Sequence, residues 1–296
     1  MLEKLKKEIS KAVVGYEEVV ELLAVALLSR GHVLLEGVPG IAKTTIAKSF
    51  AKALGLEFSR IQLTPDLMPA DIIGTYYFDQ RVSDFKFKKG PIFANVVLAD
   101  EINRAMPKTQ SALLEAMQER QVTVEGITYK LPEPFIVLAT MNPVETEGVY
   151  KLPEAQIDRF MLRIKLEYLD PFKEIEFLRR KSLKEFEEVE KVDFDFKEVK
   201  VTVSEKILNY IHRICYETRL DERVLLGASP RAMEHLLLAS KSLAFLRGRS
   251  YVLPDDVKYL ANFVLSHRII LKPEYEIDLK GEEVVMDVLK KVEVPK

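Results

Sequence analysis

The sequence predicts an α/β protein in which a parallel β-sheet is followed by a mostly helical region. Up to about Leu169, short apolar runs alternate with helical periodicity, and after Asp170-Pro171 the periodicity is almost wholly helical. Alternating strands and helices are typical of a parallel sheet covered on both faces. The length of 296 residues also predicts two domains. We therefore expect an α/β core over residues 1–169 and a helical domain over residues 170–296.

Five apolar runs are expected to form the buried strands of the core. They are His32–Leu35, Phe58–Leu63, Val96–Ala99, Phe135–Ala139 and Met161–Leu166. The helices expected between them are Tyr16–Arg30, Lys43–Leu54 and Pro107–Arg120. Two β-hairpins, at about residues 75–88 and 121–131, are predicted to interrupt the core, because each pairs short strands around a polar turn. The second region is predicted to contain helices at Pro171–Glu188, Ser204–Thr218, Pro230–Leu246 and Pro254–Ser266.

Composition argues against several classes of protein. The 44 basic and 46 acidic residues give a formal charge of −2, whereas proteins that bind nucleic acid electrostatically usually carry a basic excess. A lone cysteine, Cys215, excludes an intrachain disulfide and a zinc ribbon, which predicts a reducing compartment. The amino terminus lacks the apolar segment of a signal peptide, and the longest apolar run, Leu22–Leu28, is too short to cross a bilayer. We expect a cytoplasmic protein without a membrane span.

A phosphate-binding loop follows the first predicted strand and opens a helix. In GVPGIAKT, residues 37–44, backbone N–H groups and the helix N-terminus would surround the phosphates of a nucleotide. Lys43 is expected to reach the β- and γ-phosphates, and Thr44 to ligate Mg²⁺. Ala42 stands where the strict pattern has glycine, and alanine fits there if its backbone φ is negative. The expected nucleotide contacts are Gly37, Val38, Pro39, Gly40, Ile41, Ala42, Lys43, Thr44 and Thr45.

Polar side chains also end the third and fourth predicted strands. Asp100 would hold Mg²⁺ through water, and Glu101 would act as general base on the attacking water. The alternative is that both carboxylates merely end a strand and meet solvent. Asn142 could hydrogen-bond the γ-phosphate or orient the water, or could simply form a turn before Pro143. Together with the phosphate loop, the adjacent carboxylates predict hydrolysis of a magnesium nucleotide.

Two arginines complete the candidate site. Arg159 precedes the fifth predicted strand, and Arg231 follows Ser229-Pro230 at the start of a helix in the second region. A guanidinium group is suited to the charge of a γ-phosphate, whether it acts on its own subunit or on a neighbouring one. The alternative for each arginine is a surface salt bridge.

With these motifs in place, nearly the whole chain resembles the AAA+ ATPases and, within them, the MoxR family. The most specific stretches, besides the phosphate loop, are QLTPDLMPADIIGT (62–75), ADEINRAMPKTQSALLEAMQE (99–119), LATMNP (138–143), LPEAQIDRF (152–160) and GASPRA (227–232). The resemblance implies a P-loop NTPase fold of the AAA+ type, with a parallel five-stranded sheet in the order 5-1-4-3-2 and a C-terminal all-helical lid domain. Alanine at position 42 is the form that this family uses.

The resemblance also implies roles for individual residues. Asn142 would be sensor 1, Arg231 would be sensor 2 from the lid, and Arg159 would be the arginine finger that reaches a neighbouring subunit's nucleotide. ATP would lie between core and lid, with Val14 and Gly15 against the adenine. The roles of Asn103 and Arg104 stay open, because they could face a neighbouring subunit or cap the following helix.

The implied function is Mg²⁺-dependent ATP hydrolysis by a homo-oligomeric ring, usually a hexamer, that remodels or matures a protein client in the manner of a chaperone. MoxR-like proteins associate with partners that carry von Willebrand factor A domains. Three other functions stay open: a nucleotide-dependent assembly switch, a nucleic-acid motor and, more weakly, a small-molecule kinase. Glu101 and Arg159 favour turnover over a pure switch, and the near-neutral charge argues against nucleic acid.

Overall fold

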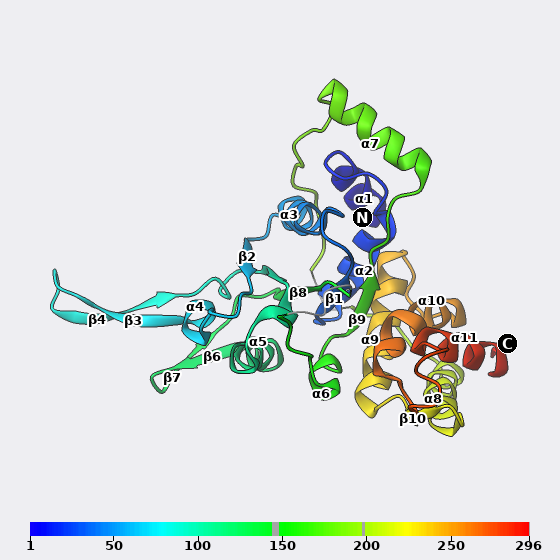
Figure 1. Ribbon diagram of the computed structural model, residues 1–296. Coiled ribbons are helices and arrows are strands. Elements are labelled where there is room, and N and C mark those ends of the chain that lie inside the picture. Colours follow the sequence, from blue (N-terminus) through cyan, green and yellow to red (C-terminus); the bar gives the residue numbers. More distant parts are fainter. Residues whose placement is uncertain (144–147, 197–198, 296) are drawn as a thin grey trace.

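The core is a five-stranded parallel sheet whose strands follow the predicted order. The computed structural model describes residues 1–143, 148–196 and 199–295. The sheet order is β2-β5-β8-β1-β9, and every neighbouring pair is parallel (Figure 1). The bounds are β1 Val33–Glu36, β2 Phe58–Gln62, β5 Val96–Asp100, β8 Ile136–Met141 and β9 Leu162–Lys165. The five predicted strands are confirmed, each to within one or two residues at its ends.

Helices cover both faces of this sheet, because its strands are apolar on both sides. In β1, Val33 and Leu35 belong to one buried cluster and Leu34 to the other, as the alternation of side chains in a strand requires. The first cluster includes α1 (Leu2–Ser10), α2 (Glu17–Leu28) and α3 (Lys43–Leu54), whereas α5 (Pro107–Glu119) packs in the second. No helix of the described residues combines the length and apolar character that a bilayer span requires.

Both predicted hairpins are present, and they form one projecting arm. The first pairs β3 (Gly74–Asp79) with β4 (Asp84–Lys89), and the second pairs β6 (Gln121–Val124) with β7 (Ile127–Lys130). A short helix, α4 (Pro69–Ile73), leads into β3. The Phe87 ring of β4 stacks on the Tyr129 ring of β7, with centroids 4.2 Å apart and an interplanar angle of 17°. This contact joins the two hairpins, which extend away from the sheet together (Figure 1).

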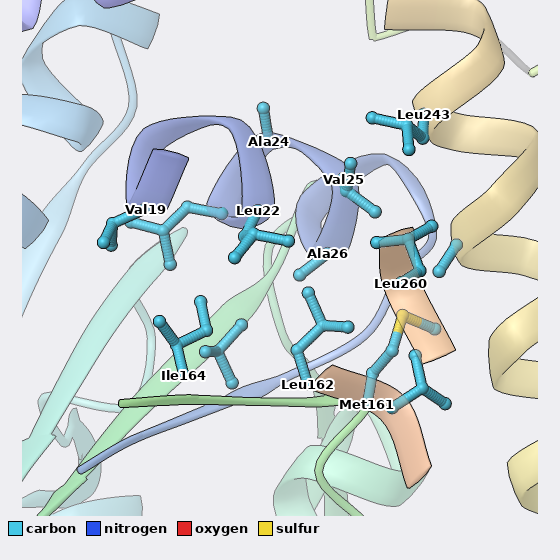
Figure 2. Packing of buried hydrophobic residues seen from close by; sticks show 14 of the residues in the cluster. Val19, Leu22, Ala24, Val25, Ala26, Met161, Leu162, Ile164, Leu243 and Leu260 are labelled. Carbon is cyan, nitrogen blue, oxygen red and sulfur yellow. The ribbon is translucent and has the colours of Figure 1, made fainter. Parts of the chain in front are cut away.

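The carboxyl-terminal helices form a bundle that packs on α2 and β9. Its elements are α8 (Glu205–Leu220), β10 (Val224–Leu226), α9 (Pro230–Leu246), α10 (Pro254–Leu265), η2 (Ser266–Arg268), β11 (Ile270–Leu271) and α11 (Gly281–Lys291). Figure 2 shows Leu22 of α2 and Leu162 of β9 in the same apolar cluster as Leu243 and Leu260 of the bundle. Beside it, the Ser29 hydroxyl donates a hydrogen bond of 2.8 Å to the Ser242 hydroxyl. Helix α2 therefore belongs to the core and to the bundle interface at once.

Helix α7 (Pro171–Leu183) stands apart from that bundle, beside α1 (Figure 1). It ends at Leu183, five residues earlier than predicted, and the following Lys184 adopts a left-handed conformation with φ of 55°. The chain then runs back along the core, where Val192 donates a backbone hydrogen bond of 2.8 Å to Ala53. The predicted helical domain, residues 170–296, thus has two parts, and only α8–α11 form the bundle. The domain boundary at residue 170 stays a prediction.

Candidate nucleotide-binding site

The phosphate-binding loop lies between the end of β1 and the start of α3. The Gly37 amide donates a hydrogen bond of 3.2 Å to the Met141 carbonyl, which ties the loop to β8. A Cβ atom on Gly37 would lie 2.3 Å from Ile41 Cδ1 and 2.9 Å from the Leu166 carbonyl oxygen, so only glycine fits there. Lys43 Nζ donates a hydrogen bond of 2.6 Å to the Gly37 carbonyl. The loop therefore holds the lysine ammonium group at the N-terminus of α3, where the helix dipole also favours an anion.

Ala42 departs from the expectation that its φ would be negative. Its φ is 62° and its ψ is 15°, which is the left-handed conformation that glycine adopts without cost. A residue with a Cβ atom loses about 1–2 kcal/mol there. The Ala42 carbonyl accepts a hydrogen bond of 2.9 Å from the Ile46 amide, which starts α3. Alanine is thus tolerated as the N-cap of the helix despite its strained backbone.

The Asp100 carboxylate at the end of β5 is buried and held from two sides. Its Oδ1 accepts a hydrogen bond of 2.6 Å from the Thr140 hydroxyl of β8. Its Oδ2 accepts two from Arg60 of β2, 3.2 Å from Nε and 2.6 Å from Nη2. Carboxylate oxygens of this kind are the ligands that Mg²⁺ prefers. Neither Arg60 nor Thr140 is among the residues that the sequence predicted for the site.

Glu101 lies next to Asp100 in a left-handed conformation, with φ of 60°. Its amide donates a hydrogen bond of 2.8 Å to the Thr140 hydroxyl, and its Oε2 accepts one of 2.7 Å from Gln62 Nε2. Arg104 Nε lies 3.4 Å from the same Oε2. The carboxylate is therefore fixed between β2 and the turn η1 (Ile102–Arg104).

The strand ends that carry these groups meet at one edge of the sheet. Met141 is the register partner of Glu36, so Asn142 follows β8 directly beside the start of the phosphate loop, and it is buried. Lys43, Asp100, Glu101 and Asn142 thus all come from elements at the carboxyl edge, as the parallel sheet predicted. Arg60 and Gln62, which sequence reasoning missed, are two residues apart on the edge strand and therefore face the same side.

One of the alternatives for Asn103 and Arg104 is wrong. Helix α5 begins after Met106 without a side-chain cap, so neither residue caps it. Arg104 lies instead beside Glu101, as described above.

A second part of the site is an apolar cavity of about 270 Å³ beside the loop. Val14 lines it, and Gly15 follows with φ of 83° and no room for a side chain next to Leu169. The other walls come from the amino-terminal segment, the loop and the region of α7: Ala12, Val13, Tyr16, Pro39, Gly40, Ile41, Ala42, Thr45, Tyr168, Leu169, Glu174, Phe177 and Phe186. Apolar and aromatic walls of this kind suit a nucleobase.

The expected position of ATP between the core and the predicted lid, residues 170–296, stays a prediction, and the part of that lid that lines the cavity is the region of α7. None of the described residues that line this cavity comes from the α8–α11 bundle. The region of α7 covers the loop instead, because the chain after β9 continues from the same edge of the sheet. Tyr16, Tyr168, Phe177 and Phe186 escaped the sequence analysis, since an aromatic residue indicates packing as readily as contact with a ligand.

Arg159 and Arg231 lie together, but at the opposite edge of the sheet from the loop of their own chain. Both line a cavity of about 830 Å³, which His32 and Met161 also line, just before β1 and β9 begin. The loop follows the other end of β1, where the Leu166 amide bonds the Glu36 carbonyl. From Met161 to Leu166 a strand spans roughly 15 Å, more than an arginine side chain reaches. The two arginines therefore cannot act on a nucleotide in their own loop.

Asp158 connects this arginine pair to the bundle. Its carboxylate accepts a hydrogen bond of 3.1 Å from Arg231 and lies 2.9 Å from Arg268 Nε. Burial lowers the pKa of Arg268 to about 10 and, together with the Arg268 charge, lowers the pKa of His235 to about 3. His235 is therefore neutral, and its Nδ1 accepts a hydrogen bond of 2.6 Å from Arg268.

Comparisons with known proteins agree with this architecture. Residues 32–162 match the profile of the ATPase family associated with various cellular activities (AAA), and residues 216–288 match the AAA lid domain. The chain is 45% identical to protein YeaC of Bacillus subtilis, over all of this chain and 95% of that one. It is 43% identical to chaperone MoxR1 of Mycobacterium tuberculosis, over 99% and 82%. A crystal structure from Cytophaga hutchinsonii superposes with a TM-score of 0.92 at 44% identity, covering 99% of this chain and 94% of that one.

Proposed function

The chain belongs to the MoxR family of AAA+ ATPases, and from that premise we propose that it hydrolyses ATP with Mg²⁺ in a homo-oligomeric ring whose subunits share their active sites. The observation that carries the proposal is the separation of the phosphate loop from Arg159 and Arg231, which lie at opposite edges of the same sheet. Two different faces of this kind complement each other head to tail, and repetition of such a contact closes a ring. A hexamer is the size that the family resemblance favours.

The residues at the carboxyl edge fit a magnesium nucleotide. The loop with Lys43 would hold the phosphates, and the Thr44 hydroxyl and Asp100 carboxylate offer the oxygen donors that Mg²⁺ takes. When bound, Mg²⁺ supplies positive charge that neutralises the phosphate oxygens. The apolar cavity beside Val14 would take the adenine.

Hydrolysis then needs a general base, which one subunit supplies, and a positive charge, which the adjacent subunit supplies. Glu101 is proposed to accept the proton of the attacking water, and Asn142 to hold that water or the γ-phosphate. Arg159 and Arg231 of the adjacent subunit would neutralise the charge that develops on the transferred phosphoryl group. An arginine supplied in this way is worth about 10³–10⁵ in rate.

We further propose that the ring acts on a protein client through the arm. The relative named chaperone MoxR1 supports a protein as the client. The first hairpin exposes four apolar side chains, namely Tyr77, Phe78, Val82 and Phe85. A client or adaptor with a von Willebrand factor A domain is the partner that the family resemblance favours, and nucleic acid is disfavoured by the net charge of −2. The cytoplasm is the proposed compartment, supported by the single free cysteine, Cys215.

The decisive experiment measures steady-state ATPase activity against protein concentration for the wild type, Arg159→Ala and Lys43→Ala. Specific activity should rise with concentration, because the site is complete only at the contact between subunits. Each variant alone should be inactive. An equimolar mixture should recover part of the activity, since an intact loop then faces an intact Arg159.

Arg213→Ala provides the matched control, because Arg213 is an exposed arginine of α8 outside the site. It should behave like the wild type. Activity that is independent of concentration, or a mixture that stays inactive while both variants remain folded, would overturn the shared site.

A further inference from the structure

The cavity that Arg159 and Arg231 line also carries other positively charged side chains. It has a volume of about 830 Å³ and lies between the amino ends of β1 and β9, the end of α5 and the start of α9. Arg30, Arg120 and Lys241 also line it. Among the described residues that form its walls, Glu234 is the only acidic one. A chain with a net charge of −2 thus gathers five cations around one opening.

Two of these cations, Arg30 and Arg120, lie at neighbouring helix ends and are joined by a hydrogen bond. Arg30 and Arg120 both adopt the left-handed conformation, with φ of 56° and 52°, although neither is glycine. Arg120 donates a hydrogen bond from Nη2 to the Arg30 carbonyl. Arg30 follows the C-terminus of α2 and Arg120 ends α5, and this conformation is common where helices end. The backbone therefore brings two like charges to one rim of the cavity.

Arg120 has capacity left for a ligand. Its carbonyl accepts a backbone hydrogen bond of 3.0 Å from Leu131, and its Nη2 is used by Arg30, but Nε and Nη1 donate to no atom of the described part of the chain. Burial lowers the pKa of Arg120, and the charge of Arg30 lowers it further, yet an arginine stays protonated. The Glu133 carboxylate lies 3.3 Å from Arg30 and partly offsets the two positive charges, and an anion in the cavity would stabilise the guanidinium pair further.

We propose that this cavity receives the triphosphate of the ATP held by the adjacent subunit, and that Arg120 acts on it in trans together with Arg159 and Arg231. The inference rests on the proposed ring. A triphosphate is the chemistry that matches the lining, because guanidinium groups bind phosphate oxygens through parallel N–H donors. In that ring the carboxyl edge of one subunit, with its loop, faces the amino edge of the next, where this cavity opens.

The test follows turnover and nucleotide affinity separately in Arg120→Ala, with Arg213→Ala as the control. Nucleotide affinity, measured with a fluorescent ATP analogue, should stay within twofold of the wild type, because the loop of the same chain is intact. The turnover number should fall at least tenfold. Arg120→Lys should recover only part of the rate, since lysine keeps the charge but lacks the guanidinium fork.

Subunit mixing then separates a trans role from a structural one. Lys43→Ala subunits should restore part of the activity of Arg120→Ala, because they present an intact Arg120 to an intact loop. If they rescue Arg159→Ala but not Arg120→Ala, the ring stands and the role of Arg120 is overturned. If they rescue neither, the shared site itself fails. Should Arg120→Ala not fold, by circular dichroism, the same mixing is done with Arg120→Gln, which keeps a donor for the Arg30 carbonyl.

Discussion

Gln62 donates a hydrogen bond of 2.7 Å to Glu101, and through it the edge strand holds the carboxylate that we propose as the catalytic base. Gln62 is the last residue of β2, and the chain continues from it through α4 into the first hairpin of the arm. We therefore expect a displacement of the arm to move Gln62, the residue that restrains Glu101. The contact links the region proposed to bind a client with the region proposed to activate water.

Release of this restraint is expected to raise basal turnover. In Gln62→Ala, Glu101 Oε2 loses one of its two neighbours and becomes free to accept a proton from water. We expect the turnover number to increase several-fold while nucleotide affinity stays unchanged, measured by phosphate release at saturating ATP. Glu101→Gln in the same background should abolish the gain. A Gln62→Ala variant slower than the wild type would mean that Gln62 orients the base rather than restrains it.

Glu101→Gln by itself should separate binding from chemistry. The amide keeps the size of the side chain but cannot take a proton, so hydrolysis should slow by about 10²–10⁴-fold. Binding of ATP should persist, because the loop and Asp100 are untouched. Nucleotide binding by fluorescence and single-turnover hydrolysis measure the two effects. Loss of binding would contradict the role proposed for Glu101.

Asp158 is expected to matter for stability as well as for the arginine pair. Asp158→Ala leaves Arg268, whose side chain is 2% exposed, without its carboxylate partner. Removal of one member of a buried ion pair costs about 3–5 kcal/mol, and the backbone carbonyls that Arg268 also contacts favour the lower end. Urea unfolding at unchanged slope measures the loss. Arg231→Ala, which removes the partly exposed partner, should cost less than about 1 kcal/mol.

Acid should destabilise the fold through His32. This side chain is buried, its Nδ1 accepts a hydrogen bond of 3.0 Å from the Val137 amide, and its Nε2 lies 3.0 Å from the Met117 carbonyl. Burial lowers the pKa of His32 to about 4, so between pH 6.5 and about 4 the unfolded chain binds a proton that the folded chain does not. The free energy of unfolding should therefore fall by roughly 3 kcal/mol over this range from His32 alone.

The control variant is His32→Asn, in which the part of the pH dependence of unfolding that comes from His32 should disappear. Urea unfolding at pH 7, 5.5 and 4.5 gives the slope for both proteins. Equal slopes would show that His32 does not titrate in this range in the unfolded chain or is protonated in the folded one.

Most of the carboxyl edge could be predicted from sequence because local patterns determine it. A strand, a glycine-rich loop and a helix follow one another in residues 33–54, and carboxylates that end an apolar run meet the same edge in any parallel sheet. Arg60 and Gln62 escaped prediction because their significance depends on pairing with β5, which is a long-range contact. Thr140 was hidden for the same reason, since only the register of β8 brings its hydroxyl to Asp100.

The position of the helices after β9 could not be predicted because periodicity reports which face is apolar but not what that face contacts. Helix α7 has the pattern of the later helices, yet its Phe177 lines the apolar cavity beside the phosphate-binding loop. The left-handed conformation of Ala42 departs from the negative φ under which alanine was expected to fit. Steric preference disfavours a positive φ, but the chain must turn there to start α3, and the fold supplies the energy.

The stack of Phe87 on Tyr129 gives the arm the mechanics of a lever. Because the stack joins the two hairpins near their base, we expect them to bend together. Six residues of β3 extend for about 20 Å, so a tilt of about ten degrees at the base would sweep the tip through about 3–4 Å. If the arm acts on a client as proposed, a small rearrangement around the nucleotide would become a larger displacement with a smaller force at the tip. Such a displacement would suit a loosely held segment of the client better than a stable folded core.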